Sequence, residues 1–209
     1  MSEQQESVTL KLMTFRDYLQ TLKLQQDLAE IKAEVSCNLE LAALARQEFK
    51  KKAGGKALLF SNLTDYDQSL AVNLFGSEKR LLKILQADSF AEFSQSLANF
   101  LVQGKRSRYR NKLHPQEVNT QLSQCDSVDL RKVPALRSWP GEREPYLTLA
   151  LAVSRHPMTE EVNLGLYRAQ IKSPNQIALN FSAGSGLAQH HQVAKKHNTR
   201  LPVALLLGS

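Results

Sequence analysis

The sequence has few cysteines, no long apolar run and no export signal. Its two cysteines, Cys37 and Cys125, exclude a disulfide framework and lack the CxxC spacing of structural zinc sites. No apolar stretch approaches the roughly 20 residues that a membrane-spanning helix needs. The N-terminus is polar and acidic, whereas a secretory signal is basic and then apolar. We therefore expect a cytoplasmic protein with reduced thiols.

Length and composition favour an ordinary globular protein. The chain has 209 residues, of which 42% are hydrophobic and 22% are charged. This length is sufficient for one large domain or two small ones, each with a buried core. We find no internal repeat and no low-complexity tract.

The net charge of +7 and a pI near 9.5 raise the hypothesis of nucleic-acid binding. The positive charge is uneven, because residues 105–112 contain five cations and no acid. Without these five residues the net charge would be +2. One basic segment is more typical of a solvated loop than of a basic domain, so nucleic-acid binding is the weakest of our functional hypotheses.

The first half of the chain alternates helical and strand-like patterns. Residues 1–13 are expected to be a flexible lead-in, and Thr14 with Asp17 has capping-box spacing before an amphipathic helix. The remaining patterns predict, in order, a strand over 29–35, a helix over 41–49, strands over 57–61 and 70–74, a helix after Gly76 and a helix from Ser89 with an apolar face. We interpret residues 14–103 as an α/β domain.

A basic and polar linker is expected over residues 104–127, and a second domain over 128–209. Its patterns predict a turn at 139–141, a strand over 147–153 that is buried on both faces, a hairpin over 163–180, a helix over 187–197 and a strand over 201–207. The fold class is therefore α/β (α+β).

The hairpin and the glycine-rich loop after it carry the candidate chemistry. Asn163 offers an amide oxygen, and Arg168 a planar cation that matches a carboxylate. An arginine in an apolar strand costs desolvation free energy unless it meets an anion. Two interpretations stay open at this point: an anion site, or a core hairpin with an edge arginine in solvent. The Gly-Ser-Gly turn at 184–186 could present backbone N–H groups to phosphate.

The histidines do not form a recognisable metal motif. His190 and His191 are adjacent and point about 100° apart on a helix, so they cannot share one metal in the usual i, i+4 manner. We expect them to be solvated. Ser185 is not in a GxSxG motif, so no serine hydrolase is indicated.

The segment NLGLYRAQI, residues 163–171, resembles the cofactor site of the UbiD family of decarboxylases, which use prenylated FMN. Other segments resemble the family in the family's order: FRDYLQTLKLQQDLAEIKAEV, ALLFSN, AVNLFGSEKRL, VDLRKVPALRSWPGEREPYLTLALAVSRHP and LPVALLLG. The resemblance runs from about Phe15 to the last residue. It implies an N-terminal α/β domain followed by part of a flavin-binding split β-barrel.

The resemblance also implies roles for particular residues. Asn163 matches a ligand of the divalent metal, Mn²⁺ or Mg²⁺, and Arg168 matches the arginine that binds the substrate carboxylate. Eight positions, Arg168 again among them, match the cofactor segments of the family: Leu166, Tyr167, Arg168, Asn180, Phe181, Ser182, Ser185 and Gly186.

The sequence departs from the family at three points. Asn180 and Ser185 stand where the family has arginines, which puts cationic phosphate contacts in doubt, and Phe181 replaces a tryptophan. The family's metal-binding glutamate and proton-donating acid lie beyond residue 209, so we expect a fragment or a truncated relative that cannot complete the reaction alone.

The leading hypothesis is UbiD-type decarboxylation of an unsaturated or aromatic carboxylic acid, with polyprenyl-4-hydroxybenzoate in ubiquinone synthesis as the substrate guess. The alternative is a non-catalytic UbiD-like binding or assembly module. The resemblance further implies a flavin prenyltransferase that supplies the cofactor and a homo-oligomer at full length. A lipophilic substrate leaves membrane association open.

A geometric difficulty accompanies these roles. In a regular strand Asn163 and Arg168, five positions apart, point to opposite faces. We expect a strand irregularity between them if both serve one site.

Overall fold

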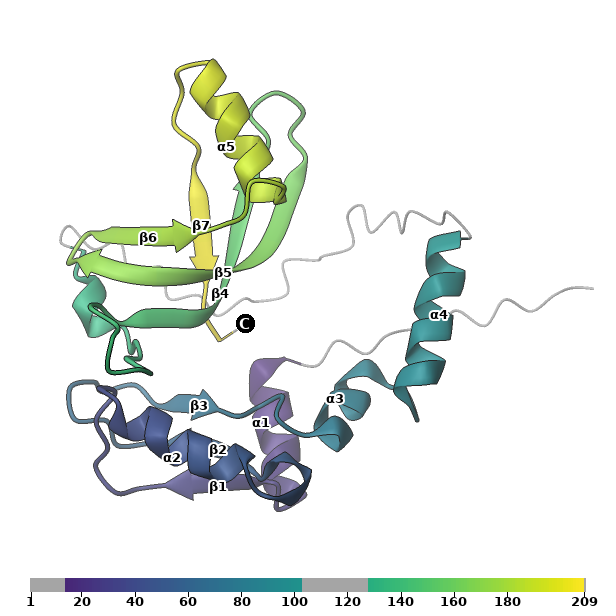
Figure 1. Cartoon of the computed structure of the whole chain (residues 1–209), viewed down its shortest axis with the longest axis vertical. Helices are drawn as coiled ribbons and strands as arrows, with labels where there is room; N and C mark the ends of the chain where they lie inside the picture. Colours follow the sequence, from purple (N-terminus) through teal and green to yellow (C-terminus); the bar gives the residue numbers. More distant parts are fainter. Residues whose placement is uncertain (1–13, 103–127, 209) are drawn as a thin grey trace, which may run out of the picture.

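The computed structural model describes residues 14–102 and 128–208, which form two β-sheets with helices (Figure 1). The expected lead-in over 1–13 and the basic linker over 104–127 lie outside these residues. No helix in the two described ranges is long and apolar enough to cross a membrane.

The first sheet has the order β1-β2-β3, with β1 parallel and β3 antiparallel to β2. Its strands are β1 (Leu28–Ile31), β2 (Ala57–Phe60) and β3 (Leu70–Val72). The helical elements around it are α1 (Phe15–Leu24), α2 (Glu40–Phe49), the 3₁₀ turn η1 (Lys52–Gly54), α3 (Glu78–Leu85) and α4 (Phe90–Val102).

Local sequence signals position most of these elements. The predicted capping box is present, because the Thr14 hydroxyl accepts from the Asp17 amide while the Asp17 carboxylate accepts from the Thr14 amide. The strand predicted over 29–35 ends at Ile31, and Val35 forms only an isolated bridge with Leu63.

The apolar face predicted for α4 is present but uncovered by the described residues. The side chains of Phe90 and Leu97 are 41% and 45% exposed. Figure 1 shows α4 standing apart from both sheets.

A buried arginine joins several elements of the first unit, by which we mean residues 14–102; residues 128–208 are the second unit. Arg80 in α3 is only 2% exposed, and its guanidinium pairs with Asp27 at 2.8 Å. It also donates to the carbonyl oxygens of Gly55, Asn73 and Leu74 at 2.7–3.2 Å. One side chain therefore joins α3 to the loops that precede β1 and β2 and the loop that follows β3.

The second sheet is antiparallel throughout, with the order β6-β5-β4-β7. Its strands are β4 (Tyr146–Arg155), β5 (Val162–Ser173), β6 (Gln176–Asn180) and β7 (Val203–Leu206). The 3₁₀ turn η2 (Leu130–Lys132) precedes them, and α5 (Gly186–Lys196) contacts β4 and β5. The hairpin, its turn and the helix after it agree with the sequence patterns.

The prediction that the strand over 147–153 is buried on both faces was wrong. Ala150 and Ala152 are fully buried, whereas Leu149 is 51% exposed. The contact with α5 that this strand makes comes from Ser154, whose hydroxyl lies 3.0 Å from the His190 Nδ1 atom.

The loop over 136–142 connects the two sheets. Backbone hydrogen bonds run from the Arg137 amide to the Cys37 carbonyl and from the Leu39 amide to the Arg137 carbonyl. Arg46 of α2 donates to the Ser138 carbonyl at 2.8 Å and lies over the Trp139 ring, 4.8 Å from its centroid. These contacts fix the start of the second unit on the first.

Replacement of Arg80 by alanine is expected to destabilise the protein by about 3–5 kcal/mol, because it leaves Asp27 and three buried carbonyl groups without their donor. Urea denaturation followed by circular dichroism measures this free energy of unfolding. Arg131→Ala is the control, since Arg131 also pairs with an aspartate but is exposed. Equal stability of the Arg80→Ala and Arg131→Ala proteins would contradict the role of Arg80.

Candidate functional site

The candidate residues divide between the two faces of the second sheet. Along β5, Asn163, Gly165 and Tyr167 face α5, and we call this the inner face. Leu164, Leu166 and Arg168 are exposed on the opposite side, which we call the outer face. This division follows from the period of two along a strand.

The irregularity that the joint site required is not in β5. Pairing with β4 is regular from Val162 to Tyr167, and the register shift lies between Leu147 and Ala150 of β4, opposite Arg168. The extra residue is in β4, so β5 keeps its alternation. Asn163 and Arg168 therefore point to opposite faces, and the expectation of an irregular β5 was wrong.

Asn163 packs against the start of α5. A Cβ atom at Gly186 would lie 2.0 Å from the Asn163 Oδ1 atom, so glycine is needed there for close approach. The Nδ2 group of Asn163 is buried and has no hydrogen-bond partner among the residues that the structure describes. An unpaired buried amide is costly and points to a missing ligand or water at this position.

Aromatic rings line the inner face next to Asn163. The ring of Tyr167 lies over Gly165, where a Cβ atom would be 2.6 Å from it. Tyr167 and Phe181 meet edge to face with centroids 6.3 Å apart, and Phe181 meets His191 in the same way at 6.0 Å. This arrangement is an apolar wall that suits a planar ring system.

Arg168 lies on the outer face directly opposite Asn180 of β6. Leu164 and Leu166, four residues and two residues before it, are 62% and 64% exposed. Within the described ranges, no ion pair or hydrogen bond occupies the Arg168 guanidinium. The outer face thus combines a cation with an apolar surface.

Ser185 has a structural role at the N-cap of α5. Its hydroxyl accepts from the Ala188 amide at 3.2 Å and donates to the Ser182 carbonyl at 2.8 Å. The side chain of Ser182 is exposed. Because the Ser185 hydroxyl already makes two hydrogen bonds, a phosphate here would bind through the backbone amides at the start of α5.

The sequence patterns missed a polar cluster beneath α5. His190 is 7% exposed and Ser154 is 3% exposed, and the His190 Nδ1 atom lies 3.0 Å from the Ser154 Oγ atom. His156 packs edge-on against His190 at 5.1 Å and accepts backbone amides of residues 158 and 159 at its Nδ1 atom. The expectation that His190 is solvated was wrong.

A periodicity in the sequence could have placed His190 correctly. Leu187, His190 and Ala194 recur at i, i+3 and i+7, and all three are buried. Burial, and then the neighbouring His156, lower the pKa of His190, while Glu161 opposes them. The Ser154–His190 pair is enclosed, so it does not present a nucleophile to substrate.

A divalent-metal site does not fit the residues that the structure describes. No group of three or more His, Cys, Asp or Glu side chains within 14–102 and 128–208 could hold a metal ion. Asn163 alone supplies one weak amide ligand, whereas Mn²⁺ and Mg²⁺ take several oxygen ligands. We derive no chemistry through a metal from this chain.

Other reactive groups are also unsuitable. Burial, and then the nearby Asp65, raise the pKa of Cys37 to about 11, so this thiol is neutral and a poor nucleophile at neutral pH.

Two family models match this two-sheet mixed fold in consecutive segments of the chain. The family model for the 3-octaprenyl-4-hydroxybenzoate carboxy-lyase N-terminal domain matches residues 19–97, and the model for its Rift-related domain matches residues 110–209. Together these two ranges hold more than four fifths of the chain. The chain belongs to the UbiD family.

Solved structures share this fold. An evolved dimeric form of the UbiD-class enzyme HmfF from Pelotomaculum thermopropionicum, in complex with prFMN, has a TM-score of 0.75 at 20% identity, over 94% of this chain and 44% of that one. Vanillic acid decarboxylase from Sedimentibacter hydroxybenzoicus in closed form gives 0.78 at 21%, over 95% and 43%. The apo 3,4-dihydroxybenzoic acid decarboxylase of Klebsiella pneumoniae gives 0.69 at 20%, over 93% and 42%.

At these identities the likeness is one of fold. The chain spans less than half the length of the solved relatives.

The lowered pKa of His190 predicts acid sensitivity. The unfolded chain binds a proton at His190 near pH 6.5 and the folded chain only at lower pH, so stability is full above 6.5 and falls as the pH drops below it. Thermal unfolding between pH 7.5 and 5 measures this loss. His190→Gln should flatten the profile, whereas the exposed His197→Gln should leave it unchanged; identical profiles for all three proteins would refute the assignment.

Proposed function

We propose that this chain takes part in non-oxidative decarboxylation of an unsaturated or aromatic carboxylic acid with prenylated FMN. The observation that carries the proposal is the consecutive match of both UbiD domain models, supported by the fold shared with a prFMN complex. When bound, the prenylated flavin supplies an electron sink for the carbanion-like centre that loss of CO₂ creates.

Arg168 orients the acid in this proposal. Its guanidinium offers a planar pair of donors to the substrate carboxylate, and Leu164 and Leu166 offer apolar contact to the unsaturated body. The exposure of Leu164, Leu166 and Arg168 on one face supports these polar and apolar contacts with one substrate. Asn180, directly opposite Arg168, adds an amide donor or acceptor at the same end.

The flavin contacts are proposed for both sides of β5. Tyr167 and Phe181 give an aromatic wall on the inner face, while Leu166 gives an apolar contact on the outer face. Ser182, Ser185 and Gly186 form the loop and first turn of α5, where backbone amides can donate to phosphate. A flavin that contacts both groups of residues has to cross the edge of the hairpin near residues 180–182.

A second candidate function is a non-catalytic UbiD-like binding or assembly module. Two observations favour it. Asn180 and Ser185 lack the positive charge of arginine, and Asn163 is separated from Arg168 by the thickness of the strand. This candidate predicts retention of the fold and of any flavin without turnover.

Flavin retention tests the first half of the proposal. Protein incubated with prenylated FMN and desalted should keep absorbance between about 340 and 460 nm, since the aromatic wall and the apolar outer face shield the ring system. Tyr167→Ala should lower the retained flavin, whereas Tyr66→Ala, in the first unit, should not. A wild-type chain that retains no flavin would contradict the cofactor assignment.

The carboxylate role of Arg168 is tested by turnover. In flavin-loaded protein that releases CO₂ from an unsaturated or aromatic acid, Arg168→Ala should lower kcat/KM by about tenfold to hundredfold, the loss expected for a charged hydrogen-bond pair. Arg168→Lys should restore part of the lost kcat/KM, because lysine keeps the positive charge but lacks the planar pair of guanidinium donors. Arg155→Ala, an exposed arginine of β4, is the control.

Full turnover by the Arg168→Ala protein would contradict the role of Arg168 in binding the substrate carboxylate. Flavin retention without any turnover in the wild type would favour the non-catalytic candidate.

A further inference from the structure

A groove of about 1060 Å³ lies in the first unit between α1 and α3, away from the proposed flavin site. Its wall includes the N-terminal turn of α3 and the residue after α1, Gln25. The first amides of any helix have no partner within the helix, so they attract anions when the end is accessible. Here the N-cap residue, Ser77, adds an independent observation.

Ser77 is a largely buried residue whose hydroxyl has no hydrogen-bond partner among the residues that the structure describes. Only 7% of its surface is exposed, and it lines the groove. It occupies the N-cap of α3 but makes no capping hydrogen bond, and no other described residue bonds to its hydroxyl. An N-cap serine ordinarily accepts from an amide of the first turn. A hydroxyl that lines the groove and does not do so is available to a ligand there.

The N-terminus of α3 is also held rigidly. Arg80, in the first turn, anchors the preceding loop by donating to the carbonyls of Asn73 and Leu74. The Asn73 amide in turn donates to the Gly54 and Lys56 carbonyls at 2.8 Å. A rigid set of donors binds an anion at a lower entropic cost than a mobile loop does.

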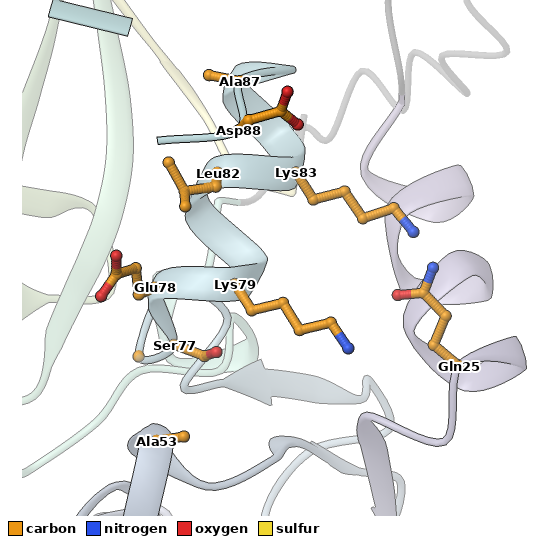
Figure 2. A pocket seen from close by; sticks show the side chains of 10 residues that line it. Gln25, Ala53, Ser77, Glu78, Lys79, Leu82, Lys83, Ala87 and Asp88 are labelled. Carbon is orange, nitrogen blue, oxygen red and sulfur yellow. The ribbon is translucent and has the colours of Figure 1, made fainter. Parts of the chain in front are cut away.

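Two lysines complete the positive side of the groove. Figure 2 shows Lys79 and Lys83, one helical turn apart on α3, extending toward α1, where Gln25 turns toward them. In the same view the Glu78 carboxylate points to the other side of α3 and Asp88 lies beyond Lys83. The negative end of the α1 dipole attracts cations, and this alone would explain why the two lysines extend toward α1. It does not explain why the Ser77 hydroxyl lacks a partner among the described residues.

We propose that the first turn of α3 binds the phosphate group of a small metabolite, with Ser77, the amides of residues 78–80 and Lys79 as its donors. Phosphate suits this set because it offers more acceptor positions than a carboxylate. Lys83 and Gln25 lie further along the groove, where they would contact the remainder of the ligand. This site is independent of the proposed decarboxylase function.

Inorganic phosphate is the probe for the test. The amide ¹H–¹⁵N resonances of Glu78, Lys79 and Arg80 are followed during a phosphate titration at constant ionic strength. We expect saturable shifts, and an affinity weakened about tenfold in both Ser77→Ala and Lys79→Gln, because each removes one donor to a charged group. Ser77→Ala should leave the thermal midpoint unchanged, since its hydroxyl makes no hydrogen bond to any residue that the structure describes.

The controls separate a built site from general charge effects. Lys196→Gln removes an exposed helical lysine of α5 and should leave the phosphate affinity unchanged. Acetate at the same concentrations should shift the three amides less than phosphate does. Shifts that do not saturate, that persist in both Ser77→Ala and Lys79→Gln, or that acetate reproduces equally would overturn the proposal.

Discussion

The alternation of side chains along β5 is the constraint on which the candidate site depends. Because regular pairing with β4 continues from Val162 to Tyr167, Asn163 and Tyr167 face α5 while Leu166 and Arg168 face outward. A ligand held by both sets must therefore approach the edge of the hairpin. Gly186, the first residue of α5, has no Cβ atom and lies directly against the Asn163 side chain.

The two faces offer different chemistry. The inner face has aromatic rings and the Asn163 amide, whereas the outer face has the Arg168 guanidinium among exposed leucines, and neither polar group has a partner among the residues that the structure describes. Together they suit a planar cofactor and an apolar acid better than they suit a metal ion. The metal ligand set would have to come from groups outside the described residues, so the flavin and carboxylate roles carry the functional proposal for this chain.

Much of the fold could be predicted from the sequence, because its signals are local. The Thr14 capping box, the turn before β6 and the apolar period of α5 each determine structure within a few residues. The outward position of Leu149 could not be predicted in the same way, since it depends on which face of β4 the helix covers. The position of the register shift in β4 rather than β5 depends on packing between strands, and no residue spacing within β5 indicates it.

The central claim is that one flavin contacts both faces of β5, and NMR of protein labelled at its leucine methyl groups and tyrosine rings tests it most directly. Addition of prenylated FMN should shift the Leu166 methyl resonances on the outer face through the ring current, together with the Tyr167 ring resonances on the inner face. The methyl resonances of Leu58, buried in the first unit, should not move. Shifts confined to one face, or absent from both, would contradict the account.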